Sequence, residues 1–385
     1  MDLESSILHM QQPRTLVFGT GCIRQLVDDL SSRGFGHVYL VCSEPVRGLV
    51  DPVFHALCKR GLAVTIDDSV NREPDMAMFE SVLERARSHN IDAVVGIGGG
   101  SVLDMAKLVG ALLHGEQGIR EVFGIGRLLC RKTWLACVPT TAGTGSEVSP
   151  NAILLDETEN LKKGVVSPFL VPDAAYVDPE LTWSVPPEIT AATGLDALTH
   201  CIEAYANRFA HPMIDLYALK GIELINAHLE TAYTHGRDPA ARSAMALGSL
   251  YGGLCLGPVN TGAVHALAYP LGGQFHIPHG VSNAMLLPLV MAFNVNAAAP
   301  RYAAMARAMG YPGKANDLET AQQAIARIRT LSNRCHIPAS LTHFGVPEQA
   351  VEQMAASAMT VTRLLQNNPA RMTLEDAEKI YRALF

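Results

Sequence analysis

The chain has 385 residues, of which 48% are apolar and 17% are charged, so it is long enough for two domains with a large buried core. Its net charge is −7 and the sequence contains no block of basic residues, which argues against nucleic acid or an anionic membrane as the main partner. No apolar run reaches the length that spans a bilayer, residues 1–6 do not resemble a signal peptide, and the eight cysteines form no Cys-x-x-Cys pair, so we expect a reduced, cytoplasmic protein.

The first half of the chain alternates short apolar strands with amphipathic helices. Such alternation predicts a parallel α/β sheet with right-handed crossovers. Gly61 is suited to the end of one of the helices, because glycine tolerates the left-handed backbone found there. The predicted helices are residues 23–30, 46–60 and 76–88, and the predicted strands are residues 15–18, 37–42, 63–67, 93–96, 134–138, 150–156 and 174–177.

A glycine-rich turn, Gly98-Gly-Gly-Ser101, follows the strand at residues 93–96 and opens directly into a helix. Consecutive glycines let the backbone approach a bulky anion, and the free amides of a helix N-terminus would face it. These features suit a pyrophosphate, although glycines alone indicate a tight turn without a ligand equally well. The turn does not follow the G-x-G-x-x-G pattern of the usual dinucleotide fingerprint.

A second segment of small and hydroxylated residues, Pro139-Thr-Thr-Ala-Gly-Thr-Gly-Ser-Glu147, follows the strand at residues 134–138. Hydroxyl groups at the end of a strand suit the ligand crevice of an open α/β sheet. The same residues are also common in polar turns, so the segment by itself leaves both interpretations open.

Beyond Pro186 and Pro187 the pattern changes to long helical periodicity with few strand signals. We therefore predict an α/β dinucleotide-binding domain over residues 1–185 and an all-helical domain over residues 186–385. The clearest predicted helices of the second domain are residues 213–229, 240–256, 290–309, 318–331 and 374–384.

Four side chains at the start of the helical region are candidate metal ligands. Asp196 and His200 are four residues apart, so on a helix they project from the same face. His265 and His279 could complete the set from a second segment. One carboxylate and three imidazoles suit Fe(II) or Zn(II) and leave a coordination position open for substrate. Any single histidine is more often an ordinary, partly buried side chain than a metal ligand.

Together these motifs resemble the iron-containing (group III) alcohol dehydrogenase family over almost the whole chain. The resemblance rests on Gly98-Gly-Gly-Ser101 with Asp104 and Lys107, on the segment at residues 139–147, on Gly194-Leu-Asp-Ala-Leu-Thr-His200, and on His265 with His279. It implies a nucleotide-binding α/β domain, a helical metal domain of the dehydroquinate synthase type, and an active site between them. It also implies oxidation of small alcohols or reduction of aldehydes by direct hydride transfer, with the substrate oxygen on the metal.

The resemblance also implies roles for individual residues and for the assembly. The metal, Fe(II) or Zn(II), would be held by Asp196, His200, His265 and His279. Family members are commonly homodimers or larger homo-oligomers, and their cofactor is NAD or NADP. The residues implied at the cofactor site are Ser43, Gly98, Gly99, Ser101, Asp104, Thr140, Thr141, Thr144 and Ser149.

The chain departs from the family pattern at two positions. Many members carry a histidine four residues after the third ligand, where this chain has Tyr269, so Tyr269 and the nearby His276 are the candidate catalytic residues for proton transfer. Members that prefer NAD often carry Asp where this chain has Ser43, which removes a charge that would repel a 2′-phosphate, although Glu44 could restore it. The sequence does not choose between the two cofactors.

Three other functions compete with the alcohol dehydrogenase hypothesis. The dehydroquinate synthase group of lyases shares the fold and uses NAD, but its metal set has Glu in place of Asp196, and its substrate calls for a Lys and Arg cluster that is not visible between Thr190 and His279. The maleylacetate reductase branch works without a metal, which a complete ligand set argues against. A binding or filament protein without turnover would not need the intact ligands and glycine turn.

Overall fold

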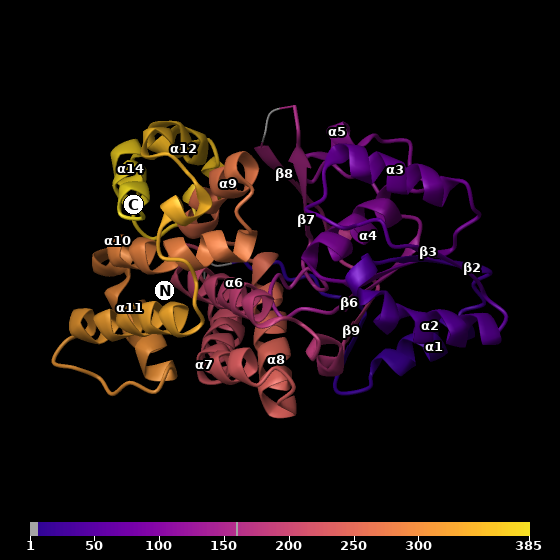
Figure 1. Cartoon of the computed structure of the whole chain (residues 1–385), viewed down its shortest axis with the longest axis horizontal. Helices are drawn as coiled ribbons and strands as arrows, with labels where there is room; N and C mark the ends of the chain where they lie inside the picture. The colour runs from indigo at the N-terminus through magenta and orange to yellow at the C-terminus, as the bar shows by residue number, and fades with distance from the viewer. Residues whose placement is uncertain (1–6, 159–160) are drawn as a thin grey trace. The chain divides into compact units, whose positions relative to one another are not determined.

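The computed structural model describes residues 7–158 and 161–385. These residues form two compact units (Figure 1), one over Gln11–Ser184 and one over Val185–Phe385 together with the described residues before Gln11. Residues 1–6, which do not resemble a signal peptide, lie outside the described part of the chain. The first unit is built around a sheet, and the second is helical.

The α/β unit is built on a six-stranded sheet in the order β1-β9-β6-β4-β2-β3, and every pairing in it is parallel. This confirms the predicted fold class. The strands are β1 (Thr15–Phe18), β2 (His37–Val41), β3 (Ala63–Asp67), β4 (Ala93–Gly98), β6 (Trp134–Pro139) and β9 (Ala174–Val177).

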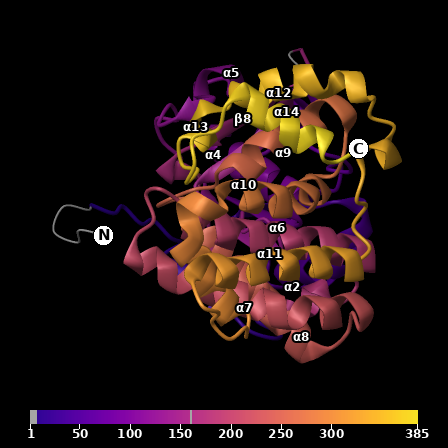
Figure 2. The same cartoon turned by 90° about the vertical axis from the view of Figure 1, so that its left-hand side faces the viewer.

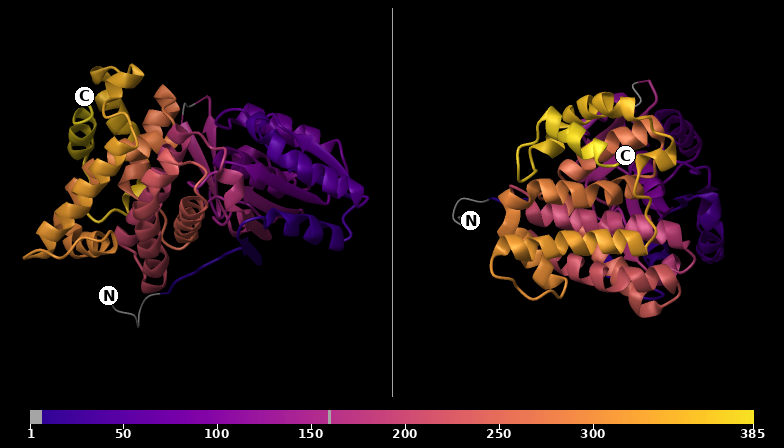
Figure 3. Two further views of the ribbon diagram at one scale, coloured as in Figure 1. Left: turned by 60° about the horizontal axis from the view of Figure 1, so that its bottom comes forward. Right: turned by 60° about the vertical axis from the view of Figure 1, so that its left-hand side comes forward.

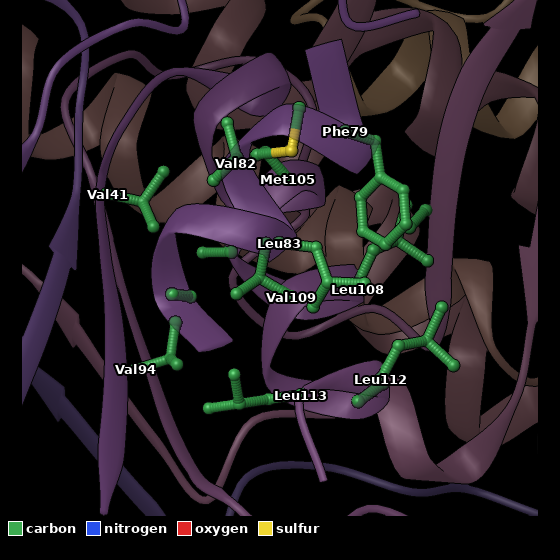
Figure 4. Packing of buried hydrophobic residues seen from close by; sticks show 14 of the residues in the cluster. Val41, Phe79, Val82, Leu83, Val94, Met105, Leu108, Val109, Leu112 and Leu113 are labelled. Atoms are coloured by element: carbon green, nitrogen blue, oxygen red, sulfur yellow. The ribbon is translucent and has the colours of Figure 1, made fainter. Parts of the chain in front are cut away.

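Helices cover both faces of this sheet (Figure 1). On one face, α1 (Ile23–Ser32) and α2 (Arg47–Lys59) pack against every second residue of the strands, for example Val38 and Leu40 of β2. On the other, α3 (Met76–Arg87) and α4 (Gly100–Leu112) contribute a dense apolar cluster that includes Phe79 and Met105 (Figure 4). Burial on both faces explains why the central strands read as continuous apolar runs.

The order of the strands reverses between β2 and β4. From β2 the chain moves outward to β3 on one side, and from β4 it moves outward to β6 on the other. In open α/β sheets, ligands bind in the crevice outside the carboxyl ends of the strands at such a point. Ser43 follows β2, and the turn at residues 98–101 ends β4, so both lie at the carboxyl ends of these two neighbouring strands.

The predicted strand at residues 150–156 forms, but it lies outside the main sheet. It is β7 (Asn151–Asp156), which pairs antiparallel with β8 (Leu161–Val166), while β8 also pairs with the short β5 (Gly124–Ile125). Neither β5 nor β8 was predicted. The Lys-Lys-Gly sequence inside β8 hides its strand character, because these residues are depleted in strands. A short helix, α5 (Ile119–Val122), precedes β5.

The helical unit begins with three helices that each carry proline in the first turn, where its missing N–H costs nothing. They are α6 (Pro187–Ala206), α7 (Pro212–Thr234) and α8 (Pro239–Leu256), and the Asp238 side chain caps α8 through the amide of Ala241 at 2.8 Å. The later helices are α9 (Ala263–Phe275), α10 (His279–Ala308), α11 (Asp317–Arg334), α12 (Val351–Met359), α13 (Thr362–Leu365) and α14 (Leu374–Arg382).

Within this unit, α10 packs against both α6 and α11, and α6 also packs against α7 (Figure 2; Figure 3, right). Helix α6 is central, and 16 of its 20 residues are buried. Among the described residues, α10 alone is long and apolar enough by composition to cross a membrane. Most of its apolar stretch is buried in the unit, as expected for a core helix of a globular domain. Helix α6, which carries the predicted ligands Asp196 and His200, is therefore surrounded by other parts of the unit along most of its length.

Candidate metal centre and nucleotide loop

Helix α6 carries the first two predicted ligands on one buried face. Asp196 is 2% exposed and His200 is 5% exposed. The Nε2 atom of His200 lies 3.9 Å from the Asp196 Oδ1 atom, as the helical spacing predicts. A carboxylate in such a position needs positive charge or hydrogen bonds around it, because an uncompensated buried charge is costly.

The other two predicted ligands come from the starts of separate helices. His265 lies in the first turn of α9, and His279 is the first residue of α10. Their Nε2 atoms are each 3.7 Å from the Asp196 Oδ1 atom. The ligand atoms of Asp196, His265 and His279 all lie within 4.8 Å of one another. His200 joins this group by stacking its ring on that of His265, with 4.8 Å between the ring centroids.

One further side chain shows that these ligand atoms face a common point. The Nδ2 atom of Asn283 lies 2.7 Å from Asp196 Oδ1, 3.1 Å from His265 Nε2 and 3.2 Å from His279 Nε2. These three distances place the predicted ligand atoms around one position in the structure. Convergent oxygen and nitrogen lone pairs on a buried carboxylate and imidazoles are what a first-row divalent metal requires, so the residues fit such an ion.

The electrostatics of the cluster favour a cation. Burial raises the pKa of Asp196, but His200, His279 and His265 with the Asn283 amide outweigh this and hold the pKa below its ordinary value. The carboxyl group therefore stays ionised at neutral pH. A permanently charged oxygen ligand beside three imidazoles offsets part of the charge of a divalent ion.

Sequence reasoning missed two residues of this cluster, Glu203 and Asn283. Glu203 is 8% exposed and contacts the Nδ1 atom of His265 at 2.5 Å. Each residue lies on the same helix face as a predicted ligand, because Glu203 follows His200 by three positions and Asn283 follows His279 by four. That spacing could have identified them once the ligands were assigned.

The two predicted cofactor segments lie side by side in the α/β unit. Gly98 pairs with Pro139 in the sheet, and the amide of Thr140 donates to the carbonyl oxygen of Gly98 at 2.9 Å. Helix α4 starts at Gly100 without a side-chain cap, so its first amides are available for an anion. Among the residues predicted to bind the cofactor in these two segments, Gly99, Ser101, Thr141 and Thr144 are partly exposed, whereas Thr140 is buried.

A buried lysine of α4 forms hydrogen bonds to the end of the segment at residues 139–147 and to the residues that follow it. Lys107 is fully buried, and its Nζ atom donates to the carbonyl oxygens of Ser146 at 2.9 Å and Ser149 at 2.8 Å. The Asp104 carboxylate accepts from the Ser146 hydroxyl at 2.5 Å and from the amide of Ile153 at 2.9 Å. Burial lowers the pKa of Lys107 and raises that of Asp104. Asp104 and Ser149 thus shape the loop, and their direct contact with a cofactor stays a prediction.

The close fit of the two segments gives a test. A Cβ atom on Gly100 would lie 2.5 Å from Thr144 Cγ2, too close unless Thr144 moves. We expect Gly100→Ala to weaken NADH binding by about tenfold, or ~1.4 kcal/mol, in a fluorescence titration. Gly110→Ala on the same helix is the control, because its new Cβ would have no atom nearer than 3.4 Å. Equal NADH affinity in both variants would contradict this placement of the cofactor.

The remaining predicted residues lie in different environments. Ser43 is partly exposed and precedes a short 3-10 helix that begins at Glu44. Tyr269 is 8% exposed, lies one turn after His265, and packs in an apolar cluster with Leu364. His276 is exposed and ends α9 with a left-handed backbone, φ 55°.

Comparison with known proteins places both units in one family. The family model described as iron-containing alcohol dehydrogenase matches residues 13–179, and the model of the C-terminal part of the same family matches residues 190–385. The chain is 39% identical to long-chain-alcohol dehydrogenase 1 of Geobacillus thermodenitrificans, over 95% of this chain and 94% of that protein.

Solved structures agree. A 1,3-propanediol oxidoreductase superposes with a TM-score of 0.95 at 34% identity, covering 99% of this chain and 100% of the other. Sulfoacetaldehyde reductase from Bifidobacterium kashiwanohense, solved in complex with NAD+, superposes with a TM-score of 0.88 at 27% identity, covering 99% of each chain.

Proposed function

Because this chain belongs to the iron-containing alcohol dehydrogenase family, an oxidoreductase family, we propose that it reduces small aldehydes and oxidises the corresponding alcohols at the cluster around Asp196. The family match favours this activity over the lyase, the metal-free reductase and the binding-protein hypotheses. The observation that carries the proposal is the convergence of Asp196, His265 and His279 on one point beside His200.

In this proposal Asp196, His200, His265 and His279 hold a divalent metal. Fe(II) agrees with the description of the family, and Zn(II) is also compatible with one carboxylate and three imidazoles. When bound, the metal supplies Lewis-acid polarisation of the substrate oxygen, and the nicotinamide supplies hydride exchange with the substrate carbon. Asp196, His200 and His265 are each at most 5% exposed, which keeps bulk water from these three residues, whereas the His279 side chain is 30% exposed.

The nucleotide-binding residues in this proposal are those at the β4 and β6 carboxyl ends. Gly98, Gly99 and Ser101 would receive the pyrophosphate on the uncapped start of α4. Thr140, Thr141 and Thr144 would line the adjoining wall. We propose NAD as the cofactor, supported by the NAD+ complex of a related structure. Ser43 carries no charge to repel a 2′-phosphate, so NADPH belongs in the same assay.

We propose that His276 and Tyr269 handle the proton that accompanies hydride transfer. His276 is exposed at the end of α9, so it can exchange protons with solvent. Tyr269 is buried one turn from His265, where its hydroxyl could pass a proton onward. Asp104 and Ser149 would support the cofactor through the loop that they shape.

We also propose a homodimer or larger homo-oligomer in the cytoplasm. Strand β1 is an edge strand of the main sheet, and its residues Leu16 and Phe18 are 39% and 38% exposed. Exposed apolar edge strands favour pairing with another chain. Two of the free cysteines, Cys58 and Cys130, are exposed, which suits a reducing compartment.

The test of the activity is a substrate screen on the purified protein loaded anaerobically with Fe(II) or with Zn(II). Relatives are named for long-chain alcohols, 1,3-propanediol and sulfoacetaldehyde, so the panel should span short, long and charged aldehydes. Oxidation of NADH or NADPH that depends on an aldehyde is the expected result. No turnover with any aldehyde and either cofactor would contradict the proposal.

Metal removal gives a separate expectation. Dialysis against a strong chelator should lower turnover by about three orders of magnitude, because Lewis-acid catalysis contributes several kcal/mol. Readdition of Fe(II) or Zn(II), but not of Mg²⁺, should restore it, since three imidazoles select transition metals. Unchanged turnover in a sample shown to be metal-free by elemental analysis would refute a metal-dependent mechanism.

A further inference from the structure

One face of α6 continues beyond the two metal ligands. Asp196 and His200 are followed on it by Glu203, three residues after His200, which keeps the three side chains on one side of the helix, and Asn207 is the residue directly after the helix ends. Asn207 donates to the carbonyl oxygen of Val259 at 2.7 Å, in the turn before α9. Glu203 thus lies between the ligands and the segment that leads to His265.

The Glu203 carboxylate makes two contacts to the start of α9. Its Oε1 atom accepts from the amide of Val264 at 2.7 Å, and its Oε2 atom accepts from the Nδ1 atom of His265 at 2.5 Å. Gly262 precedes α9 and provides no side-chain cap. Glu203 therefore caps α9 from a different helix and binds a ligand histidine with the same carboxylate.

Both partners of Glu203 must be donors. The amide of Val264 can only donate, and a carboxylate can only accept, so the proton of a neutral His265 ring is on Nδ1. The lone pair of that ring is then on Nε2, the atom that lies 3.7 Å from Asp196 Oδ1. Metal-binding histidines generally need their other nitrogen fixed in this way.

The surroundings hold the carboxylate in this position. A Cβ atom on Gly262 would lie 3.2 Å from Glu203 Oε1, so the chain passes close to the carboxylate. Behind it is a buried cavity of about 10 Å³, room for about one water molecule. Its lining includes Asn294 and Asn368, whose side-chain amides bond each other reciprocally at 2.8 and 2.7 Å.

We propose that Glu203 is a positioning residue that fixes the tautomer and orientation of His265. Because the same carboxylate also caps the first turn of α9, the conformation of that turn and the affinity for metal depend on one side chain. This inference rests on the proposed metal site. We expect neither aspartate nor glutamine to fill this role, because aspartate is one methylene shorter and glutamine has one acceptor oxygen where the two donors contact two.

The decisive variant is Glu203→Gln, which keeps the size of the side chain. If glutamine accepts from Val264, its amide N–H groups face His265 and favour the proton on Nε2, where the metal should bind. We expect the affinity for Zn(II), measured by chelator competition on the full chain, to fall 10- to 100-fold. In long-range proton–nitrogen NMR of the ¹⁵N-histidine-labelled apoprotein, the Nδ1–H signal of His265 should also be lost.

Glu230→Gln is a matched control in the same unit. The Glu230 carboxylate also accepts from two donors, Arg327 and Arg334, each at 2.8 Å, on the surface of α7. Its replacement should lower the melting temperature without changing Zn(II) affinity or the His265 signal. A general loss of structure would affect both variants alike, whereas a positioning role affects Glu203→Gln alone.

His265→Ala identifies the His265 signal and separates two outcomes. If His265→Ala loses the metal but Glu203→Gln binds it like the wild type, this inference is wrong and the proposed metal site stands. If His265→Ala retains wild-type affinity, the metal site itself is wrong. Should Glu203→Gln not fold, the wild-type apoprotein still decides, because an Nε2–H tautomer of His265 there would overturn the inference.

Discussion

Replacing His265 by alanine is expected to remove the bound metal and to lower turnover of the best aldehyde by about 10³-fold, or ~4 kcal/mol of transition-state stabilisation. His265 is one of three residues whose ligand atoms converge within 4.8 Å, and it is 4% exposed, so alanine removes a buried nitrogen from the group. Metal content by elemental analysis and steady-state kinetics on the same preparation measure both effects.

His343→Ala is the matched control for this loss. His343 lies in the same helical unit, in an exposed 3-10 helix, and its ring contacts only the adjacent Phe344 among the described aromatic residues. The control should keep wild-type metal content and turnover. Wild-type turnover in His265→Ala would show that the cluster is not the catalytic centre.

Gly280→Ala is expected to destabilise the helical unit by about 3 kcal/mol and to weaken metal binding. A Cβ atom at Gly280 would lie 2.3 Å from the carbonyl oxygen and 2.7 Å from the carbonyl carbon of Ala192, which belong to the backbone of α6. Backbone atoms in a central helix cannot turn aside as a side chain can, so the start of α10 must shift. His279, the residue before Gly280, would be displaced from Asp196.

Chemical unfolding and Zn(II) competition measure these two consequences. Gly48→Ala on α2 provides the comparison, because a Cβ atom there meets nothing within 4 Å. Gly48 is exposed in the first turn of α2, so alanine there should leave stability unchanged or raise it by up to ~1 kcal/mol. If Gly280→Ala unfolds at the wild-type denaturant concentration and binds metal with wild-type affinity, α6 and α10 do not approach each other as closely as described.

The central strands of the main sheet could be predicted from the sequence because they are buried on both faces. The predicted strands at residues 37–42 and 134–138 coincide with β2 and β6 to within one residue, and the helix at residues 76–88 coincides with α3 to within one residue. The small sheet could not be predicted in the same way. Strand β8 carries two lysines, and its strand character depends on its pairing with β7 rather than on its composition.

Local sequence patterns indicate some of the proposed metal ligands better than others. Asp196 and His200 follow from helical spacing alone. That His265 and His279 would approach them depends on how three helices pack, which no local pattern encodes, and their assignment came from resemblance to a family. For Glu203 and Asn283 the sequence offers only their helical spacing from His200 and His279, and a Glu or Asn on a helix is ordinarily a solvent-exposed residue. Only the fold shows that both are buried against the ligands.

The most direct measurement is anomalous diffraction from crystals of the metal-loaded protein, recorded across the iron and zinc absorption edges. We expect one strong peak per chain at about 2.0–2.2 Å from a carboxylate oxygen of Asp196 and from one nitrogen each of His200, His265 and His279. A map without a peak at this place, or with these four side chains directed away from a common centre, would contradict the proposed enzyme.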